Sequence, residues 1–482
     1  MPSSRVVRFT PSSDQVRRTE LDPHIEAIRA DLQVSAEFPA EVTAAAEAAA
    51  AAPRLPDLDR TDLEFLTIDP ASAMDLDQAL HLERAGDGYR VHYAIADLMA
   101  FISPDDPVDL ESRRRGETLY GADSKVPLHP PAISEAAGSL LPDEVRPALL
   151  WTIDLDADGE GTRAHVERAR VRSRRRWDYA EAQAALDAGT GGEQLELLRE
   201  IGELRMAREA ARGGVSLPLP EQEVEVTDGH LRLVFRQLLP VEEWNAQISL
   251  LTGMAAASLM VYARIGLLRT LPPADPRDVR RLHRTAAALG IEWPAEMTYP
   301  DFIRSLDPSR PAHAAMVVAC TRLLRGSGYA AFDGELPAEP EHSAIASEYA
   351  HVTAPLRRLA DRYASEVCVA LCADADVPAW VRERLHELPD VMRESGRRAN
   401  QYENQVLNLI EAVVLADRVG EEFSGVVVEA SEKDPTRGEV TVPDPAVEAR
   451  VSSARPLPVG EQVTLRLSEA DPASRSVQFT LE

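Results

Sequence analysis

The stretch "TIDPASAMDLDQAL" (67–80) contains the residues whose types and spacing most directly suggest chemistry. Asp69, Asp75 and Asp77 lie within it, and the last two, separated by one residue, can point to the same side of an extended segment. Such a cluster of like charges is unfavourable unless a cation lies among the carboxylates, whose oxygens are the hard ligands that Mg²⁺ prefers. The spacing indicates a Mg²⁺ site, and the alternative is a polar loop that caps neighbouring helices and turns.

A second aspartate-rich stretch, "DLDADGEG" (154–161), matches the opening of a calcium-binding EF-hand loop. The twelfth loop position, where a bidentate glutamate is needed, is His165, and the flanking residues have strand-like patterns. We therefore predict a hairpin turn around Asp158-Gly159. The sequence has no HExxH, P-loop or GxSxG motif, and its three cysteines have no CxxC spacing, so zinc, acyl-transfer and disulfide chemistry lack their usual signatures.

The aspartates of 67–80 fall at the ends of predicted strands. One strand is expected over 63–69, and two more, over 76–84 and 89–98, flank the hairpin signal Gly86-Asp87-Gly88. Strand-like and helical stretches alternate further on, and the stretch 281–420 is mostly helical in pattern. This order predicts a large α+β domain over 59–419.

Both ends of the sequence differ from this domain in their pattern of apolar and polar residues. Residues 24–52 predict two alanine-rich helices, interrupted at Phe38-Pro39 and stopped by Pro53, with too little apolar bulk for a core of their own. We expect a small helical module over 1–58, with a helix-turn-helix unit as an alternative that no motif supports. Residues 420–482 contain five short alternating strands, which fit an OB-type β-barrel of the kind that binds single-stranded nucleic acid.

Composition limits the partners and the location. The formal net charge of −28 argues against a polyanionic partner, but binding depends on where the basic residues lie, and these are clumped in three runs. Each run is either a solvated face or part of a positive groove, and the runs are "RARVRSRRRW" (168–177), "PLRRLADR" (355–362) and "SGRRAN" (395–400). We see no apolar run of about 18 residues and no secretory signal, and so expect a cytoplasmic protein without a membrane span.

Several motifs in a fixed order resemble the ribonuclease II/ribonuclease R (RNB) family of exoribonucleases. "FLTIDPASAMDLDQALHLER" and "YRVHYAIADL" are similar to its defining segment, "SRRRWDYAEAQAAL" to its basic strand and Tyr-led helix, and "PVEEWNAQISLLTGMAA" to its Glu-Glu helix. "YAHVTAPLRRLADR" resembles its Thr-Ser-Pro-Ile-Arg-Arg signature, and the tail its S1-type OB domain. The resemblance runs from about residue 60 to 482. It implies a multidomain α+β protein with an RNB-type catalytic domain.

The resemblance also implies roles for single residues. The metal carboxylates would be Asp69, Asp75 and Asp77, and Arg357 would be the clamp on the scissile phosphate, followed by Arg358 in the same basic pair. Tyr120 matches the aromatic that stacks at the RNA 3′ end, Tyr179 and one of Glu242 or Glu243 match positions that sense the ribose, and Glu403 matches a late conserved glutamate.

This sequence departs from the family pattern at several positions. The family usually carries a fourth aspartate directly after the third, where this chain has Gln78, whose neutral amide cannot supply the charge that attracts a second Mg²⁺. Ala354 replaces the signature serine, Leu359 its tyrosine, and Leu217 stands at the second stacking aromatic. The N-terminal module is too short for the family's usual pair of cold-shock domains.

The resemblance implies processive hydrolysis of single-stranded RNA from its 3′ end to nucleoside 5′-monophosphates, with Mg²⁺ as cofactor and Mn²⁺ as a substitute. It implies no obligate protein partner, and a monomer is expected. Two alternatives stay open. One is a non-catalytic RNA-binding relative, because Gln78 replaces the fourth aspartate, and the other is an unrelated Mg²⁺ phosphohydrolase acting on small molecules.

Overall fold

The computed structural model describes residues 8–9, 18–121, 125–219, 221–227 and 230–482. Its main body is built on a closed barrel with the strand order β2-β3-β4-β7-β8. The strands are β2 (Phe65–Ile68), β3 (Gln78–Ala85), β4 (Gly88–Ala96), β7 (Val145–Leu155) and β8 (Gly161–Trp177). The three strands predicted from 63–98 are thus confirmed, with Asp69 directly after β2 and Asp77 directly before β3.

Alternation along the strands sorts side chains between the barrel interior and a helical shell. Ala94, Leu150 and Phe65 belong to a small cluster drawn from all five strands, which fills the interior. Tyr93 and Trp151, at positions of the opposite parity, pack into the large outer cluster with the helices. This shell includes α4 (Tyr179–Asp187), α5 (Gly192–Arg212), α6 (Pro240–Ala263) and α10 (Leu359–Cys372).

Helix α6 differs from the sequence expectation. It is long and apolar enough to cross a membrane by length and composition, although no such run was expected. Trp244, Ile248, Leu251 and Met260 lie buried in the outer cluster of the barrel, where α6 packs against α5 and α10. The apolar composition of α6 is therefore explained by its place as a core helix.

The turn between β7 and β8 is the predicted hairpin at Asp158-Gly159. Gly159 has φ +77°, and a Cβ there would lie 2.8 Å from the Cβ of Leu204 on α5, so the position requires glycine. The EF-hand alternative is not realised, because Asp156 instead accepts backbone N–H bonds from Asp158 and Glu160 within the turn.

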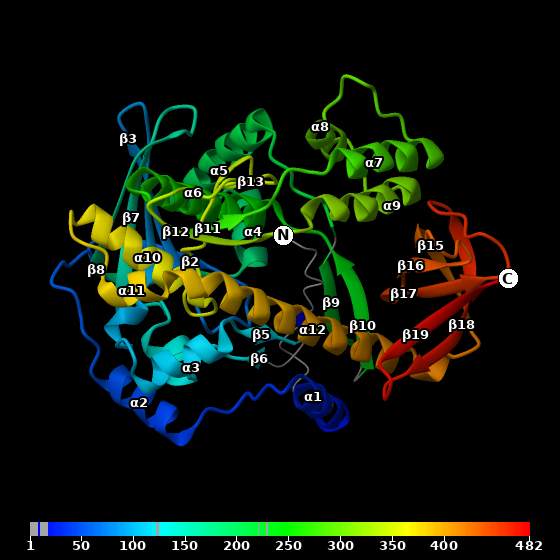
Figure 1. Ribbon diagram of the computed structural model, residues 1–482, viewed down its shortest axis with the longest axis horizontal. Coiled ribbons are helices and arrows are strands. Elements are labelled where there is room, and N and C mark those ends of the chain that lie inside the picture. Colours follow the sequence, from blue (N-terminus) through cyan, green and yellow to red (C-terminus); the bar gives the residue numbers. More distant parts are fainter. Residues whose placement is uncertain (1–7, 10–17, 122–124, 220, 228–229) are drawn as a thin grey trace.

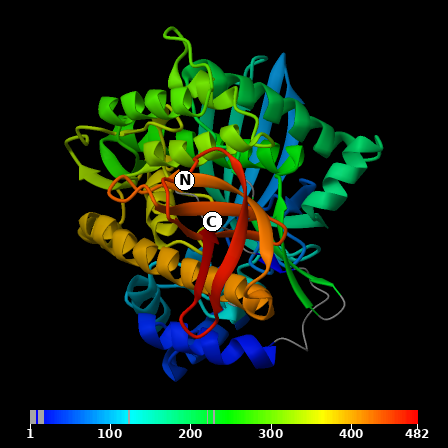
Figure 2. The same cartoon turned by 90° about the vertical axis from the view of Figure 1, so that its right-hand side faces the viewer.

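The chain ends in a second closed barrel with the order β15-β16-β17-β19-β18, as the OB-type prediction requires. Its strands are β15 (Glu422–Ala430), β16 (Arg437–Pro443), β17 (Ala446–Ser453), β18 (Gln462–Asp471) and β19 (Ser476–Leu481). The long helix α12 (Leu388–Leu415) runs from the main body to this barrel (Figure 1). On another side of the barrel, α9 (Pro311–Cys320) packs on β15, and Arg322 pairs with Glu429 (Figure 2).

The two N-terminal helices pack separately. Leu21, Ile25 and Ile28 of α1 (Arg18–Leu32) join the cluster of α12 and the C-terminal barrel. Val42 and Ala46 of α2 (Ala40–Ala51) join another cluster beside α3 (Pro107–Arg115). Among the described residues these helices share no core, so they do not form a helix-turn-helix unit.

The remaining elements connect these parts. The short helices are η2 (Leu98–Ala100), η3 (Ala132–Ala137), α7 (Pro276–Ala288), α8 (Tyr299–Arg304), η4 (Thr321–Leu324), α11 (Ala379–Arg384), η5 (Leu385–Glu387) and η6 (Ala416–Arg418). The strands are β1 (Arg8–Phe9), β5 (Leu119–Tyr120), β6 (Lys125–Val126), β9 (Glu221–Thr227), β10 (His230–Arg236), β11 (Ile265–Thr270), β12 (Gly328–Asp333), β13 (Glu341–His342) and β14 (Ser347–Glu348). The stretch 281–420, expected to be mostly helical, thus also carries three short strands.

Candidate active site

Asp77 and the loop 353–358 form the centre of the site. The backbone N–H of Leu356 donates to Oδ1 of Asp77 at 2.8 Å, and Nε of Arg357 lies 3.6 Å from Oδ2. Burial raises the pKa of Asp77 well above its ordinary value, while Arg357 and the Leu356 N–H oppose that rise and the nearby Asp75 adds to it. A buried carboxylate is thus held against one guanidinium and beside a second carboxylate.

The backbone of the loop 353–358 is fixed on several sides. Gln78 donates its side-chain amide to the Thr353 carbonyl at 2.5 Å, and Asp361 accepts the Ala354 N–H at 2.7 Å. The N–H of Thr118 donates to the Arg357 carbonyl at 3.0 Å. The loop therefore presents the Arg357 side chain, which is 45% exposed, from a rigid base.

The two arginines of the loop have different environments. Arg358 donates to both carboxylate oxygens of Asp361, at 2.9 and 3.0 Å, and Asp361 is completely buried. Among the described residues Arg357 has no such bidentate partner, and its side chain stays 45% exposed beside Asp77. The Arg357 guanidinium can therefore bind an anion. The Arg358 guanidinium instead holds the loop to Asp361.

Both oxygens of Asp75 are engaged by the short ladder of β5 and β6. Tyr120 donates its hydroxyl to Oδ2 at 3.2 Å, and Nζ of Lys125 lies 3.2 Å from Oδ1. Tyr120 and Lys125 face each other as cross-strand partners, and Lys125 also lies 2.7 Å from a carboxylate oxygen of Glu135 in η3. Sequence reasoning missed Lys125.

Asp69 completes the group at the end of β2. Its N–H donates to the Trp177 carbonyl at 3.2 Å, and Arg176 holds the carbonyls of Pro70 and Ala71 at 3.1 and 2.6 Å. Strands β2 and β3 pair antiparallel with Leu66 opposite Leu80, so Asp69 after β2 and Asp77 before β3 lie at the same end of the barrel. The structure thus gathers all three predicted aspartates on one side of the barrel end.

These residues fit a divalent cation in their donor chemistry and charge. In the described part of the chain no group of three or more His, Cys, Asp or Glu is arranged as a ready ligand set. Nevertheless, the carboxylates supply hard oxygen donors, and Asp75 adds to the rise in the pKa of Asp77 that burial causes, as expected for carboxylates close together. Two cationic side chains, Arg357 and Lys125, already stand against this charge.

The predicted ribose-sensing residues lie on α4 and α6. Tyr179 is the first residue of α4, and it adds to the raised pKa of the Tyr93 hydroxyl, which burial chiefly causes. Glu242 accepts from Arg236 at 2.6 and 3.0 Å and from the Leu239 N–H at 2.8 Å, so its carboxylate is occupied. Glu243 is the exposed member of the pair. Although the residue as a whole is exposed, partial burial of its carboxyl group raises the pKa of Glu243, and the nearby Glu209 and Glu242 raise it further.

Two further sequence assignments have no described contact with the aspartates. Glu403 lies half-buried on α12, where burial raises its pKa to about 7. Leu217, the position of the missing second aromatic, packs partly buried against the cluster around α7 to α9. The roles of all the assigned RNA-binding residues stay predictions.

Arginines of the basic run 168–177 mostly hold the fold together. Arg170 pairs with Asp59 at 3.2 Å, Arg174 donates to the Thr61 carbonyl at 2.7 Å, and Arg175 stacks on Trp177. Together with Arg176 they fasten the segment that leads into β2 and Asp69. The run therefore positions the site, and it does not supply a row of free cations.

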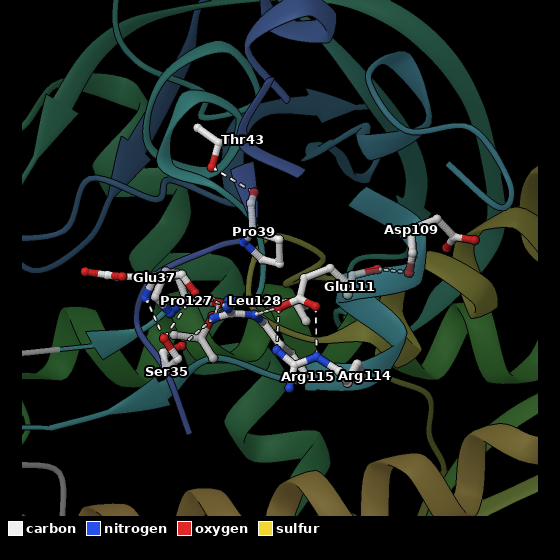
Figure 3. Close-up of polar contacts among 12 residues, drawn as sticks. Ser35, Glu37, Pro39, Thr43, Asp109, Glu111, Arg114, Arg115, Pro127 and Leu128 are labelled. Atoms are coloured by element: carbon white, nitrogen blue, oxygen red, sulfur yellow. Dashed lines mark hydrogen bonds and ion pairs between the residues drawn. The ribbon is translucent and has the colours of Figure 1, made fainter. Parts of the chain in front are cut away.

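Arg115 holds the N-terminal linker, residues 33–39 between α1 and α2, against the main body (Figure 3). Its guanidinium donates to the carbonyls of Ser35 at 3.0 Å, Glu37 at 2.7 Å and Pro127 at 2.9 Å, and to Glu111 at 2.7 Å. It also stacks on Phe38, with 3.8 Å from guanidinium carbon to ring centroid. Arg115 thus connects the N-terminal linker to Pro127, which directly follows β6. This contact supports the segment that carries Lys125.

A polar cavity of about 350 Å³ lies at the other end of the barrel formed by β2, β3, β4, β7 and β8, near the turns that close the hairpins. None of the residues assigned to the site lines it. Its lining residues are Arg60, Leu63, Glu83, Arg90, His92, Thr152, Asp154, Arg163, His165 and Glu167.

With this geometry established, the comparisons with known proteins define the family. Residues 58–372 match the RNB domain, and residues 421–482 match the RNase II-type exonuclease C-terminal S1 domain. The first match covers more than half of the chain, and the chain belongs to the RNB family. The domain boundaries at 58/59 and 419/420 stay predictions.

The relatives share modest sequence identity and a common fold. The chain is 26% identical over 354 residues to the human exosome complex exonuclease RRP44, which covers 69% of this chain and 36% of that protein. Mycoplasma genitalium RNase R in complex with ribose methylated single-stranded RNA has a TM-score of 0.83 at 19% identity, covering 95% of this chain and 77% of the other. Yeast Ssd1, a pseudonuclease, has a TM-score of 0.71 at 15% identity, covering 91% and 56%. The chain spans less than two thirds of the length of the curated relatives it matches.

Proposed function

We propose that this protein is a 3′-to-5′ exoribonuclease that hydrolyses single-stranded RNA to nucleoside 5′-monophosphates with the help of Mg²⁺. The observation that carries this proposal is the exposed guanidinium of Arg357, 3.6 Å from buried Asp77 on a loop fixed by hydrogen bonds. Family membership and a fold shared with an RNase R bound to single-stranded RNA support it. The cytoplasmic location and the monomeric state stay predictions.

In this proposal the chain's own residues bind and orient the RNA end. Arg357 holds the scissile phosphate and stabilises the negative charge that grows on it in the transition state, an effect worth about 3 kcal/mol in comparable sites. Tyr120, 40% exposed beside Asp75, offers a ring on which the last base stacks. When bound, Mg²⁺ would be held by Asp69, Asp75 and Asp77 and would supply an activated water for in-line attack.

Preference for RNA is proposed to come from contacts with the ribose 2′-hydroxyl. Glu243 is exposed and its pKa is raised, whereas the Glu242 carboxylate is taken by Arg236 and the helix start. Of the two glutamates that the sequence left open, Glu243 is therefore the better acceptor for a hydroxyl hydrogen. Helix α4, which begins at Tyr179, packs against α6, which carries Glu243.

The second candidate is a non-catalytic RNA-binding protein. The specific observation that favours it is the Gln78 side chain, which is tied to Thr353 and contributes no charge to the site. The similarity in fold to a pseudonuclease shows that this architecture exists without nuclease activity. The three aspartates and Arg357 favour the exoribonuclease.

Product chemistry tests the proposal. The full-length protein is incubated with Mg²⁺ and either an unstructured RNA or a DNA of the same sequence, and the products are identified by mass spectrometry. We expect nucleoside 5′-monophosphates from RNA only, with full activity in the control Asp87→Asn, which changes an exposed hairpin residue. Products that carry 3′-phosphates, or equal cleavage of DNA, would overturn the proposal.

A further inference from the structure

Lys125 lies between two carboxylates at the edge of the aspartate group. Its ammonium nitrogen is 3.2 Å from Oδ1 of Asp75 and 2.7 Å from Oε1 of Glu135, and its side chain is 28% exposed. The cross-strand pairing with Tyr120 on β5 fixes the place of its backbone. The ammonium therefore stands where a cation bridging Asp75 and Glu135 would stand.

The choice of lysine at this position is unusual for this chain. Of its 52 basic residues, Lys125 and Lys433 are the only lysines, and all others are arginines. An arginine presents a broad planar fork, whereas an ammonium is a compact point charge with three donors that can direct hydrogen bonds to separate oxygens. The chain thus departs from its general use of arginine at the point where a compact cation fits between two carboxylates.

The charges around the site show what remains for a metal to neutralise. Four carboxylates gather here, namely Asp69, Asp75, Asp77 and Glu135, and the facing cations are Lys125 and Arg357. Asp361, which also adds to the raised pKa of Asp77, is paired with Arg358, so this pair cancels in the sum. With all four carboxylates ionised, as metal binding requires, two negative charges are left, which match a single divalent ion. Gln78 adds none, because its amide is neutral and donates to Thr353.

We propose that Lys125 is a built-in cation of this site, taking the place of a second divalent ion at Asp75 and Glu135, so that the protein binds one divalent ion per chain. The inference rests on the proposed function only in assuming that the aspartates hold a divalent ion. Removing the ammonium leaves Asp75 and Glu135 without their cation and creates room and charge for a second metal.

Metal stoichiometry without RNA tests the inference. Mn²⁺ binding to the full-length protein is measured by titration calorimetry and by the loss of the free-ion electron paramagnetic resonance signal. We expect one Mn²⁺ per chain for the wild type and for Lys125→Arg, which keeps the charge, and two for Lys125→Met. The matched control is Lys433→Met, which removes the other lysine at an exposed turn of the C-terminal barrel and should leave one ion.

Two Mn²⁺ ions on the wild type, no Mn²⁺ on the wild type, or one ion on a folded Lys125→Met would each overturn the inference. The wild-type stoichiometry decides even where Lys125→Met does not fold. RNA cleavage is measured separately. A wild type that binds one ion and leaves RNA intact contradicts the proposed function alone, and one that degrades RNA but binds two ions contradicts only the role of Lys125.

Discussion

Gln78 donates its side-chain amide to the backbone carbonyl of Thr353 at 2.5 Å, across 275 positions of sequence. This hydrogen bond joins the first residue of β3 to the loop that presents Arg357. A carboxylate has no hydrogen to donate and would face the carbonyl oxygen with its own negative charge. Gln78 is thus a structural link between the two halves of the site.

Replacing Gln78 by glutamate keeps the shape of the side chain and removes the donor. We expect Gln78→Glu to lower the free energy of unfolding by about 1–3 kcal/mol in EDTA, because a buried carbonyl loses its partner. Urea denaturation measures this change, and Gln401→Glu, at an exposed position of α12, is the matched control. Equal stability of the two variants would show that the link is not energetically important.

The two neighbouring arginines should respond in opposite ways to truncation. Arg357→Ala should cost roughly 10² to 10³ in kcat/KM on RNA with little change in stability, because its side chain is exposed and acts on transition-state charge. Arg358→Ala should lower the free energy of unfolding by about 3–5 kcal/mol, since it leaves buried Asp361 without its guanidinium. Steady-state kinetics and urea denaturation on both variants check this, and the reverse assignment would refute the geometry.

Arg115 should hold the N-terminal linker in place. We expect Arg115→Met to lower the free energy of unfolding by about 3–5 kcal/mol and to raise amide hydrogen exchange over residues 33–39, because three backbone carbonyls and Glu111 lose their donor. Arg114→Met is the control, since Arg114 shares the Glu111 partner but its side chain is 60% exposed. Unchanged exchange over 33–39 in Arg115→Met would contradict this role.

Arg168 pairs with two buried carboxyl groups, those of Asp97 and Glu366. This group should make the free energy of unfolding depend on pH. Burial raises the pKa of Glu366 to about 7, and Arg168 only partly offsets it. Because the folded state then binds the proton more tightly than the unfolded state, this carboxyl destabilises the fold as pH rises through about 4.5 to 7, by about 1–3 kcal/mol. We expect Glu366→Gln to flatten the fall in unfolding free energy between pH 5 and 8, whereas exposed Glu383→Gln should not.

The adjacent glutamates of α6 should separate sugar recognition from folding. Glu243→Gln should lower the preference for RNA over DNA in kcat/KM by roughly tenfold or more, since a carboxylate acceptor for the ribose hydroxyl is lost. Glu242→Gln should instead lower the melting temperature, because Arg236 loses one of the two contacts of its bidentate pair with the carboxylate and the charge that stabilises the helix start is removed. If Glu242→Gln changes the sugar preference and Glu243→Gln does not, the assignment is reversed.

The strands, the C-terminal barrel and the closeness of the three aspartates could be predicted from the sequence because they depend on local patterns, whereas the barrel of β2, β3, β4, β7 and β8 was not predicted. Period-two alternation and turn residues define β3 and β4, and the aspartates are close in sequence, so few alternatives remain for their placement. Arg357 was predicted only through resemblance to the family. Its position depends on contacts with Asp77 and Thr118, which are distant in the chain.

Other features of the site depend on tertiary contacts that no local pattern encodes. Glu242 and Glu243 are neighbours in the sequence, and no local pattern distinguishes them. The contact with Arg236 determines which of the two carboxylates is already paired. Lys125 had a signal in the composition, as one of two lysines among 52 basic residues, but its partner Glu135 is identified only by the fold. Helix α6 has the length and composition of a membrane span. Its apolar side chains are explained by the neighbours that they contact in the core, which only the fold identifies.

The most direct test of the central claim is a gel time course on a 5′-labelled, unstructured RNA of about 30 nucleotides with Mg²⁺, using the wild type and Asp77→Asn. The account predicts that the wild type shortens the RNA to an end product of a few nucleotides, that EDTA stops this, and that Asp77→Asn leaves the RNA intact while still shifting it in a binding gel. RNA that the wild type binds but never shortens would contradict the exoribonuclease and favour the non-catalytic RNA-binding protein.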